Sequence, residues 1–282
     1  MESALDPVLG AAFPVFALIL CGVLAGRFRL INPGSSEALN RFVYTFALPA
    51  MLFMAVYRGS LDELLGSGSF LLGVILATLG TALVGFALSA FVQRAKPAES
   101  VLRGLNASFA NTGYLGIPLV SVAYGERAAL PAALATVARS PLIWPIALAV
   151  ICVALQVRVP LPVERFATLL AAAAGPCALF AIGLFVSQLS IRAGLRASWP
   201  TTTLKLVLHP LLMALLAFQL LSIDAFWAKI AVVCASLPLG ATAFVLAQRY
   251  RVLEAETSTG AVLSTAASVV TVSAVMIMLA AR

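Results

Sequence analysis

The sequence predicts an all-α integral membrane protein, and three observations support that prediction. The chain of 282 residues is 62% hydrophobic and only 10% charged. Its apolar residues form long intervals without a charge, and these match the roughly 20 residues that a helix needs to cross a bilayer. A moderate internal repeat also relates the first part of the chain to the second.

The composition excludes several classes of protein. Soluble domains carry about 25% charged residues. A chain of this length with only 18 Lys+Arg and 11 Asp+Glu has too few charged residues to form a water-exposed surface. A soluble enzyme, a secreted disulfide scaffold and a disordered chain are therefore ruled out. The net charge of +7 comes from basic residues scattered between apolar runs, so they indicate orientation in a membrane and no nucleic-acid partner.

The cysteines give no sign of a metal or disulfide site, and no cofactor is predicted. All four lie inside apolar runs, where a buried thiol acting as a small hydrophobe is the favoured interpretation: Cys21, Cys152, Cys177 and Cys234. The acidic residues 1–6 lack the basic region of a cleavable signal, so the first apolar run is expected to remain as a span.

Nine intervals between consecutive charged residues are long enough to cross a bilayer. They are too long for barrel strands and do not alternate with period two, so each is expected to be a helix. The nine intervals are 7–26, 42–57, 64–93, 104–125, 140–157, 166–191, 206–223, 230–248 and 257–281. A tenth interval, 128–138, is too short to cross alone.

The charged loops predict an orientation in the membrane, and they conflict with the apolar length of one stretch of the chain. With the N-terminus outside, the basic loops after the first and third spans lie inside, as the positive-inside rule requires. The basic residues of two later loops, Arg192 with Arg196 and Arg249 with Arg251, should also lie inside. They do so only if the stretch between Arg127 and Arg158 crosses an even number of times, yet its apolar length suffices for about one and a half crossings.

The internal repeat accounts for the conflict. A shift of 127 residues superimposes seven identical residues between Pro33 and Ser60 on those between Pro160 and Ser187, including two prolines at the same spacing. The same shift places Gly113 on Gly240. We therefore expect two repeats, 1–138 and 139–282, each derived from five spans, with most of the fifth helix absent from the first. An odd number of spans in each repeat makes the two halves inverted.

Two spans carry Gly/Pro interruptions at corresponding places in the repeats. Paired interrupted helices are typical of a transporter's midplane binding site, and the helix N-termini after such breaks suit a carboxylate. The alternative is that these prolines merely kink packed helices. The predicted substrate-binding residues lie at the breaks: Asn111, Gly113, Tyr114, Pro118, Pro238, Gly240 and Thr242.

Ionisable residues narrow the mechanism. The sequence places no Asp or Glu deep inside an interval, so coupling through a buried carboxylate is not expected. For His209, a ring satisfied by a neighbouring carbonyl is favoured over a proton relay. No serine shares its helix face, which argues against an intramembrane protease.

At these residues the chain resembles the auxin efflux carrier family. The resemblance covers nearly the whole chain except 128–140. Its matching stretches are Phe13–Phe53, with Asn40-Arg41-Phe42-Val43 and Leu48-Pro49, then Asn111–Pro118, Gly175–Leu184, Leu237-Pro238 with Phe244–Ala247, and Ser264–Thr271.

The resemblance implies a ten-helix fold of two inverted five-helix repeats, with a scaffold domain and a transport domain in which broken helices four and nine cross. It implies efflux of a small organic anion across the plasma (inner) membrane. Asn111 and Pro118 match the first crossover, and Pro238 with Gly240 the second. This chain departs from the family in lacking most of helix five, so about nine spans are expected, with 140–157 as helix six and 128–138 as a short remnant.

Three classes of function are therefore considered. A membrane transporter for a carboxylate, working by alternating access, is favoured. A non-transporting paralogue, disabled by the loss of helix five, is the alternative, and a membrane enzyme is third. The expected partners are the organic anion, the lipid bilayer and, as an open alternative, a second copy of the chain.

Overall fold

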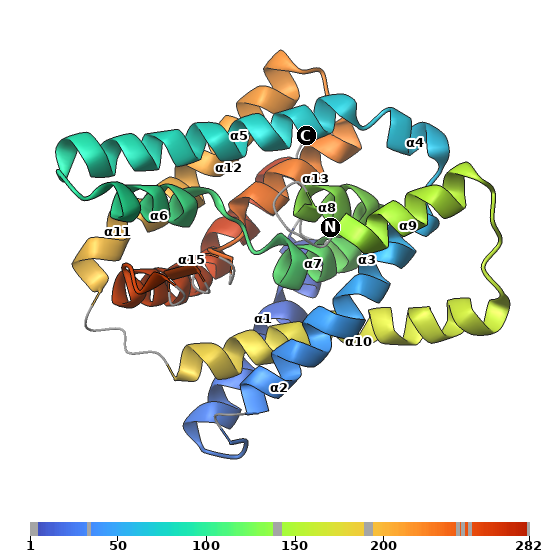
Figure 1. The fold of residues 1–282 in the computed structure, drawn as a ribbon, viewed down its shortest axis with the longest axis horizontal. Coiled ribbons are helices and arrows are strands. Elements are labelled where there is room, and N and C mark those ends of the chain that lie inside the picture. Colours follow the sequence, from blue (N-terminus) through green and yellow to red (C-terminus); the bar gives the residue numbers. More distant parts are fainter. Residues whose placement is uncertain are drawn as a thin grey trace. The chain divides into compact units, whose positions relative to one another are not determined.

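The computed structural model of the protein describes residues 5–32, 35–137, 143–188, 194–240, 243, 246–247 and 250–280. These residues are helical, apart from turns, connecting segments and one isolated antiparallel bridge between Ala110 and Leu239. The chain forms two compact units (Figure 1). Unit 1 comprises residues 1–68 and 112–188, and unit 2 comprises residues 69–111 and 189–282. The predicted repeats, 1–138 and 139–282, follow a different division and remain a prediction.

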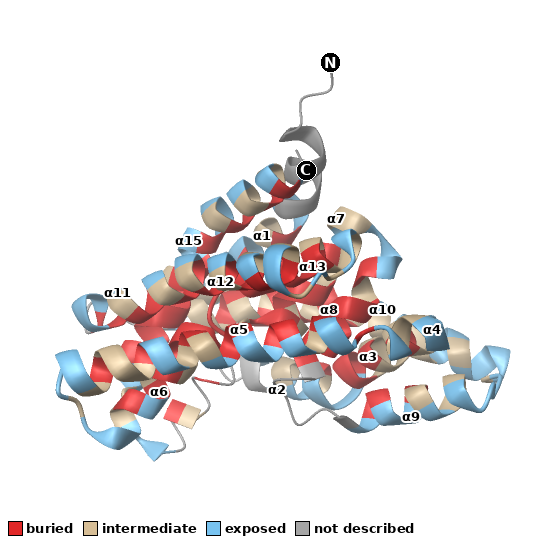
Figure 2. Cartoon of the chain, turned by 90° about the horizontal axis from the view of Figure 1, so that it is seen from above, coloured by how far each residue is buried: buried red, intermediate tan, exposed pale blue. Residues whose placement is uncertain are grey.

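Five helices are long and apolar enough to cross a membrane, which confirms the predicted class of protein. They are Ala38–Tyr57, Gly68–Val92, Leu161–Ser187, Leu195–Leu220 and Glu254–Ala280. Shorter apolar helices cover Phe13–Arg27, Thr112–Tyr124, Trp144–Ala154 and Ala225–Ser236. Many large apolar side chains on these helices are exposed, as Figure 2 shows along α5. Such surfaces suit hydrocarbon rather than water.

Unit 1 is built around two helices that approach closely. A side chain on Gly22 of α1 would overlap the Phe180 carbonyl of α10, and one on Gly183 would overlap the Ile19 carbonyl. Small residues at such contacts let backbones pack tightly in lipid, where the hydrophobic effect does not drive helix association. The elements of unit 1 are α1 (Leu5–Arg27), α2 (Ser35–Phe42), η1 (Val43–Ala47), α3 (Leu48–Tyr57), α4 (Leu61–Leu65), η3 (Thr112–Gly116), α7 (Ile117–Tyr124), η4 (Glu126–Ala128), α8 (Ala129–Val137), α9 (Ile143–Ala154) and α10 (Leu161–Ser187).

Unit 2 packs its helices through similar small-residue contacts. On α5, a side chain at Gly85 would meet Ala107 of α6. Phe70 of the same helix meets the Trp227 ring of α13 edge-on, with 5.1 Å between the ring centroids. The elements of unit 2 are α5 (Gly68–Ala87), η2 (Leu88–Val92), α6 (Pro97–Ser108), α11 (Leu195–Thr203), η5 (Leu204–Leu208), α12 (His209–Leu215), η6 (Leu216–Leu220), α13 (Ala225–Ser236) and α15 (Glu254–Ala280).

Prolines set the local form of three of these helices. Each proline is preceded by a five-residue π-helical turn that ends two residues before it: η1 before Pro49, η3 before Pro118 and η5 before Pro210. A proline cannot donate the i→i−4 backbone hydrogen bond and its ring crowds the preceding turn. A widened π turn accommodates both effects without ending the helix. Pro49 therefore alters the turn that precedes it, and the helix continues to Tyr57.

The stretch between Glu126 and Val159 contains two short described helices, and helix six at 140–157 remains a prediction. In this stretch α8 covers Ala129–Val137, with 9 residues, and α9 covers Ile143–Ala154, with 12, while residues 138–142 lie outside the described residues. At 1.5 Å per residue these lengths correspond to about 14 and 18 Å, short of the ~30 Å hydrocarbon core. Figure 1 shows α9 joined to α10 by an extended connection.

Both ends of this stretch meet the same end of α3. Arg58, which follows α3, donates a hydrogen bond from Nη1 to Oε2 of Glu126 at 2.7 Å. The hydroxyl of its neighbour Tyr57 accepts a hydrogen bond from the backbone N–H of Val159 at 3.1 Å. The two ends of the stretch therefore lie at one end of α3. A hairpin that enters through α8 and returns through α9 is the hypothesis that fits these contacts and the positive charges, and the single span that the apolar length of 140–157 suggests is the alternative.

Lys205 corrects a second boundary. The sequence places Lys205 in a loop before a span at 206–223, but the helical segment begins at Leu195 and runs to Leu220. Lys205 lies near its middle and is fully buried. Charge-free intervals locate a helix end wrongly wherever a charged residue is satisfied inside the protein.

The returning hairpin predicts the labelling of single cysteines introduced into a background in which the four native cysteines are alanine. Arg127→Cys and Arg158→Cys should react equally with a membrane-impermeant maleimide in intact cells, because both ends of the stretch share one face. Arg29→Cys and Arg94→Cys, also exposed, should react only after the membrane is permeabilised. Labelling of Arg127→Cys and Arg158→Cys from opposite faces would show that the stretch crosses once.

Candidate functional site

Two interrupted segments pair directly in unit 2. The backbone N–H of Asn111 donates to the Pro238 carbonyl at 2.9 Å, and the N–H of Gly240 donates to the Phe109 carbonyl at 2.9 Å. Ala110 and Leu239 form the antiparallel bridge between these two bonds. Each segment thereby satisfies backbone groups that the other leaves open, as irregular backbone at membrane depth requires.

Two further contacts hold this crossover of residues 109–111 and 238–240. The backbone N–H of Leu239, whose side chain is buried, donates to Oγ of Ser264 on α15 at 3.1 Å. A side chain at Gly240 would lie 3.1 Å from the Ala110 carbonyl oxygen, so close approach favours a residue without one. The crossover therefore depends on the glycine that the repeat places at position 240.

Asn111 contributes an amide to the crossover. Its residue is 7% exposed, and in the described part of the chain its side chain makes no hydrogen bond, although its backbone N–H is bonded to Pro238. An amide offers both donors and acceptors. Asn111 can therefore bind a polar ligand at the point where the two segments meet.

A buried cation lies beside the same crossover. The ammonium group of Lys205, which is fully buried, donates to the Ala235 carbonyl at 2.6 Å and lies 3.0 Å from Nδ1 of His209, which is also fully buried. Ala235 is the penultimate residue of α13, and the break at Pro238 follows it. The C-terminal end of a helix carries partial negative charge, so a cation there is stabilised. Lys205 thus lies inside the protein close to the break, with its Nζ bonded to the end of α13.

Polar contacts tie α15 to α6 within unit 2. Arg103 donates from Nε and Nη2 to the two carboxylate oxygens of Glu256, each at 2.8 Å, and Nδ2 of Asn106 donates to Oγ1 of Thr257 at 2.9 Å. The hydrogen bond to Glu256 raises the pKa of Arg103 above its ordinary value, while burial acts in the opposite direction. This bidentate pair of an arginine and a carboxylate joins the two helices.

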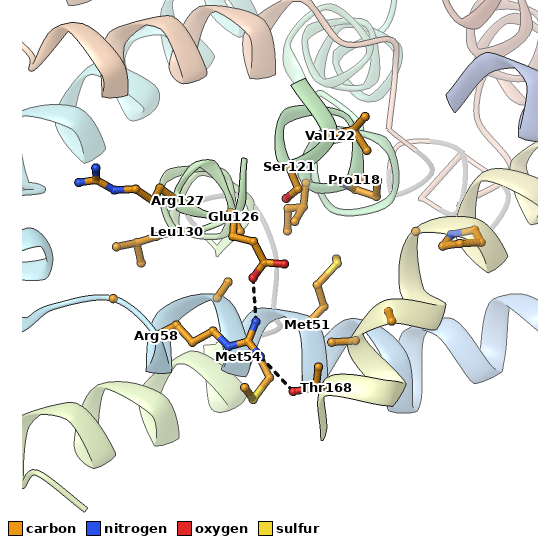
Figure 3. Close-up of a pocket in the computed structure, with 18 of the residues that line it drawn as sticks. Met51, Met54, Arg58, Pro118, Ser121, Val122, Glu126, Arg127, Leu130 and Thr168 are labelled. Carbon is orange, nitrogen blue, oxygen red and sulfur yellow. Dashed lines mark hydrogen bonds and ion pairs between the residues drawn. The ribbon is translucent and has the colours of Figure 1, made fainter. Parts of the chain in front are cut away.

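Unit 1 contains a cavity of about 430 Å³ (Figure 3). Apolar and small side chains line its interior, among them Met51, Met54, Pro118 and Gly175. The ring of Pro118 faces Gly175 of α10, where an added side chain would approach it to 3.1 Å. The cavity is large enough for a small organic molecule.

Charged residues lie at one side of this cavity. Arg58 bonds both Glu126, at 2.7 Å, and Oγ1 of Thr168, at 3.2 Å, and both contacts are drawn in Figure 3. Arg127 points away from this pair in the figure and lies 3.7 Å from Glu63. These pairs are exposed, so they are weak and exchange readily with water. Arg58 can therefore release Glu126 and receive another carboxylate.

The structure brings together three of the residues that the sequence predicts for the site. Asn111, Pro238 and Gly240 meet at the crossover in unit 2. Gly113 and Tyr114 belong to η3 and Pro118 to α7, all in unit 1, where Gly113 packs beside Thr136 of α8. Thr242 lies outside the described residues.

Sequence reasoning missed Lys205 and Arg58 as candidate site residues. Both were treated as loop charges that mark the ends of spans. One signal could have identified Lys205: it is a lone basic residue in the long stretch between Arg196 and Asp224, which carries no other charge. Among the described residues no group of three or more His, Cys, Asp or Glu could hold a metal ion.

The fold and the crossover define a membrane protein with paired broken helices. Comparison with known families agrees: the family described as "Membrane transport protein" matches residues 7–138 and 127–276. The chain belongs to this family, which confirms the resemblance to the auxin efflux carriers. The two matched segments meet and overlap at 127–138, the stretch that contains α8.

Individual relatives carry the names of transporters. A protein of Rhizobium meliloti (strain 1021) named "Putative malonate transporter" is 31% identical over 95% of this chain and 95% of its own length. The "Uncharacterized transporter YfdV" of Escherichia coli (strain K12) is 23% identical over 86% of this chain and 88% of its own. A protein of the same name from Shigella flexneri matches equally.

The alignments also show that the relatives are longer within the matched region. The alignment with the Rhizobium protein extends over 309 positions, more than the 282 residues of this chain. The relative therefore has residues that this chain lacks. This difference in length agrees with a loss of sequence inside the chain.

Proposed function

We propose that the protein is a secondary transporter that carries a small organic anion, with a carboxylate as the group recognised. The observation that carries the proposal is the crossover of residues 109–111 and 238–240, because paired broken helices at membrane depth are the binding sites of many transporters. Asn111, Gly113, Tyr114, Pro118, Pro238, Gly240 and Thr242 are the proposed substrate-binding residues.

The charges near the crossover support an anion as substrate. Lys205 is buried beside the end of α13. Glu256, an acidic residue of α15, is already bound to Arg103. Helix N-termini after the breaks add positive partial charge, each contributing on the order of 0.3–1 kcal/mol to binding a negative group. A substrate with one or two carboxylates meets these groups best.

The named relatives support the same class of substrate. The Rhizobium protein is named for malonate, a small dicarboxylate, and is 31% identical over nearly its whole length. Arg58, at the side of the cavity in unit 1, supplies a guanidinium that suits bidentate recognition of a carboxylate. We propose that Arg58 contributes to recognition of the carboxylate, and that alternating access moves the anion across the membrane.

The hairpin of α8 and α9 supports an orientation in the cell membrane with the N-terminus outside. If the stretch 127–158 returns to the face where it began, the basic loops at Arg94, Arg196 and Arg251 all lie inside. That arrangement places these basic loops on the side that the positive-inside rule favours. It agrees with unit 2, where Arg94 and Arg196 line one cavity and so share a face. We propose two inverted repeats whose fifth and sixth helices are shortened into this hairpin.

One observation favours a second candidate, a family member that binds the anion without moving it. The described parts of α8 and α9, with 9 and 12 residues, are each shorter than a membrane span. Helix α8 packs against α3, α7 and η3, which are the elements beside the cavity. A hairpin of this length that fixes these elements in one arrangement would allow binding and prevent flux.

Flux in proteoliposomes tests the proposal. Purified protein should take up radiolabelled malonate, and unlabelled dicarboxylic acids should compete with it. The corresponding neutral diesters should compete at least about tenfold more weakly, because they lose charge-assisted hydrogen bonds. Equal competition by acid and diester would contradict recognition of the carboxylate. Saturable binding of malonate with no uptake would support the non-transporting candidate.

Replacement of Asn111 tests the site. Asn111→Ala should lower the initial rate of malonate uptake by about tenfold, because a hydrogen bond to a charged ligand is lost, while the thermal unfolding midpoint changes little. Asn32→Ala, at an exposed position outside the helices, is the matched control and should transport like the wild type. A folded Asn111→Ala variant with the wild-type rate would remove Asn111 from the site.

A further inference from the structure

A second cavity of about 430 Å³ lies within unit 2 and has a strongly basic lining. The turn after η2, the start of α6 and the start of α11 form it. The lining residues are Gln93, Arg94, Ala95, Lys96, Glu99, Arg103, Arg196, Ala197 and Pro200. None of the residues proposed to bind the transported anion belongs to it.

The charges in this cavity leave an excess of positive groups. Of its four basic residues, Arg103 is bound to Glu256, and the nearby Glu99 also acts electrostatically on Arg103. Arg94, Lys96 and Arg196 are exposed, and in the described part of the chain no ion pair joins them to an acidic residue. Three cations that converge on one hollow attract an anion with several oxygen acceptors.

Exposed apolar side chains flank the same cavity. Phe91 and Val92 precede Gln93 in sequence and are 78% and 71% exposed, while Trp199, beside Pro200, is 63% exposed. In membrane proteins, tryptophan is enriched where the hydrocarbon meets the headgroups. These exposed apolar residues are thus next to the basic lining residues along the chain, an order that suits a headgroup and its acyl chains.

We propose that this basic cavity binds the phosphate headgroup of an anionic phospholipid. Arg94, Lys96 and Arg196 contact the phosphate oxygens, and the acyl chains lie against Phe91, Val92 and Trp199. Basic pockets at the ends of membrane helices bind such headgroups, and each exposed cation strengthens the attraction to an anionic lipid. A free phosphate would use the cations and leave the apolar flank in water, so the lipid fits both parts of the site. The site is independent of the proposed transport function.

Native mass spectrometry of delipidated protein tests the proposal. The full chain in neutral detergent is mixed with equal amounts of phosphatidylglycerol and phosphatidylcholine that carry identical acyl chains. The wild type should bind one phosphatidylglycerol in preference. In the double variant Arg94→Gln/Arg196→Gln the ratio of bound phosphatidylglycerol to bound phosphatidylcholine should fall about tenfold, because two cations near the headgroup are removed.

A matched double variant separates the cavity from general surface charge. Arg27→Gln/Arg29→Gln removes the same charge from exposed positions, and like the test pair it includes one residue in the left-handed backbone region, Arg29 at φ 55° against Arg94 at φ 52°. This variant should keep the wild-type preference. If Arg94→Gln impairs folding, Lys96→Gln/Arg196→Gln replaces it and should give the same loss.

Three results would overturn the proposal. The first is an unchanged preference for phosphatidylglycerol in both folded cavity variants. The second is an equal loss of preference in Arg27→Gln/Arg29→Gln, which would show attraction to the whole surface. The third is complete displacement of the lipid by millimolar inorganic phosphate, which would assign the cavity to a soluble anion. Failure of malonate uptake leaves these readouts unaffected.

Discussion

The antiparallel pairing of residues 109–111 with 238–240 is the constraint on which the rest of unit 2 depends. A helix that breaks within a bilayer must satisfy its open N–H and C=O groups inside the protein. Here each break supplies the partner of the other, through Asn111 to Pro238 and Gly240 to Phe109. The pairing favours a glycine at 240, because a Cβ there would lie only 3.1 Å from the Ala110 carbonyl oxygen. It also fixes where α13 ends, and so where its partial negative charge lies.

The buried charges follow from that arrangement. Lys205 lies against the Ala235 carbonyl at the end of α13, a position where helix geometry stabilises a cation. Arg103 and Glu256 neutralise each other between α6 and α15, and Ser264 of α15 accepts a bond from Leu239. The groups beside the crossover, Lys205 included, thus have partners inside the protein. An anionic substrate is the chemistry that this balance favours.

Much of this could be predicted from the sequence, and the exceptions have physical causes. Prolines 118 and 238 with Gly240 located both breaks, because proline and glycine act on the backbone locally. The sequence places Lys205 in a loop because the use of charge-free intervals assumes that every charge meets water. Its partners are instead inside the protein: the Ala235 carbonyl, which is distant in sequence, and His209, one helical turn away. The course of the stretch between Arg127 and Arg158 appeared in the sequence only as a conflict between charge and length. Tertiary contacts of Tyr57 and Arg58, which no sequence pattern indicates, bring its two ends to one end of α3. The sequence does not predict Arg58 as a site residue, because only the fold brings it to Glu126 and Thr168.

Disulfide formation between the two broken segments tests the crossover most directly. Ala110 and Leu239 face each other between the two backbone bonds, where Cα atoms of an antiparallel pair lie about 4.5 Å apart. That separation suits a disulfide. In a background with the four native cysteines replaced by alanine, Ala110→Cys/Leu239→Cys should form an intramolecular disulfide on mild oxidation, detected by mass spectrometry of the linked peptides. Each single variant should stay a free thiol. A folded double variant that retains two free thiols after oxidation would contradict the crossover.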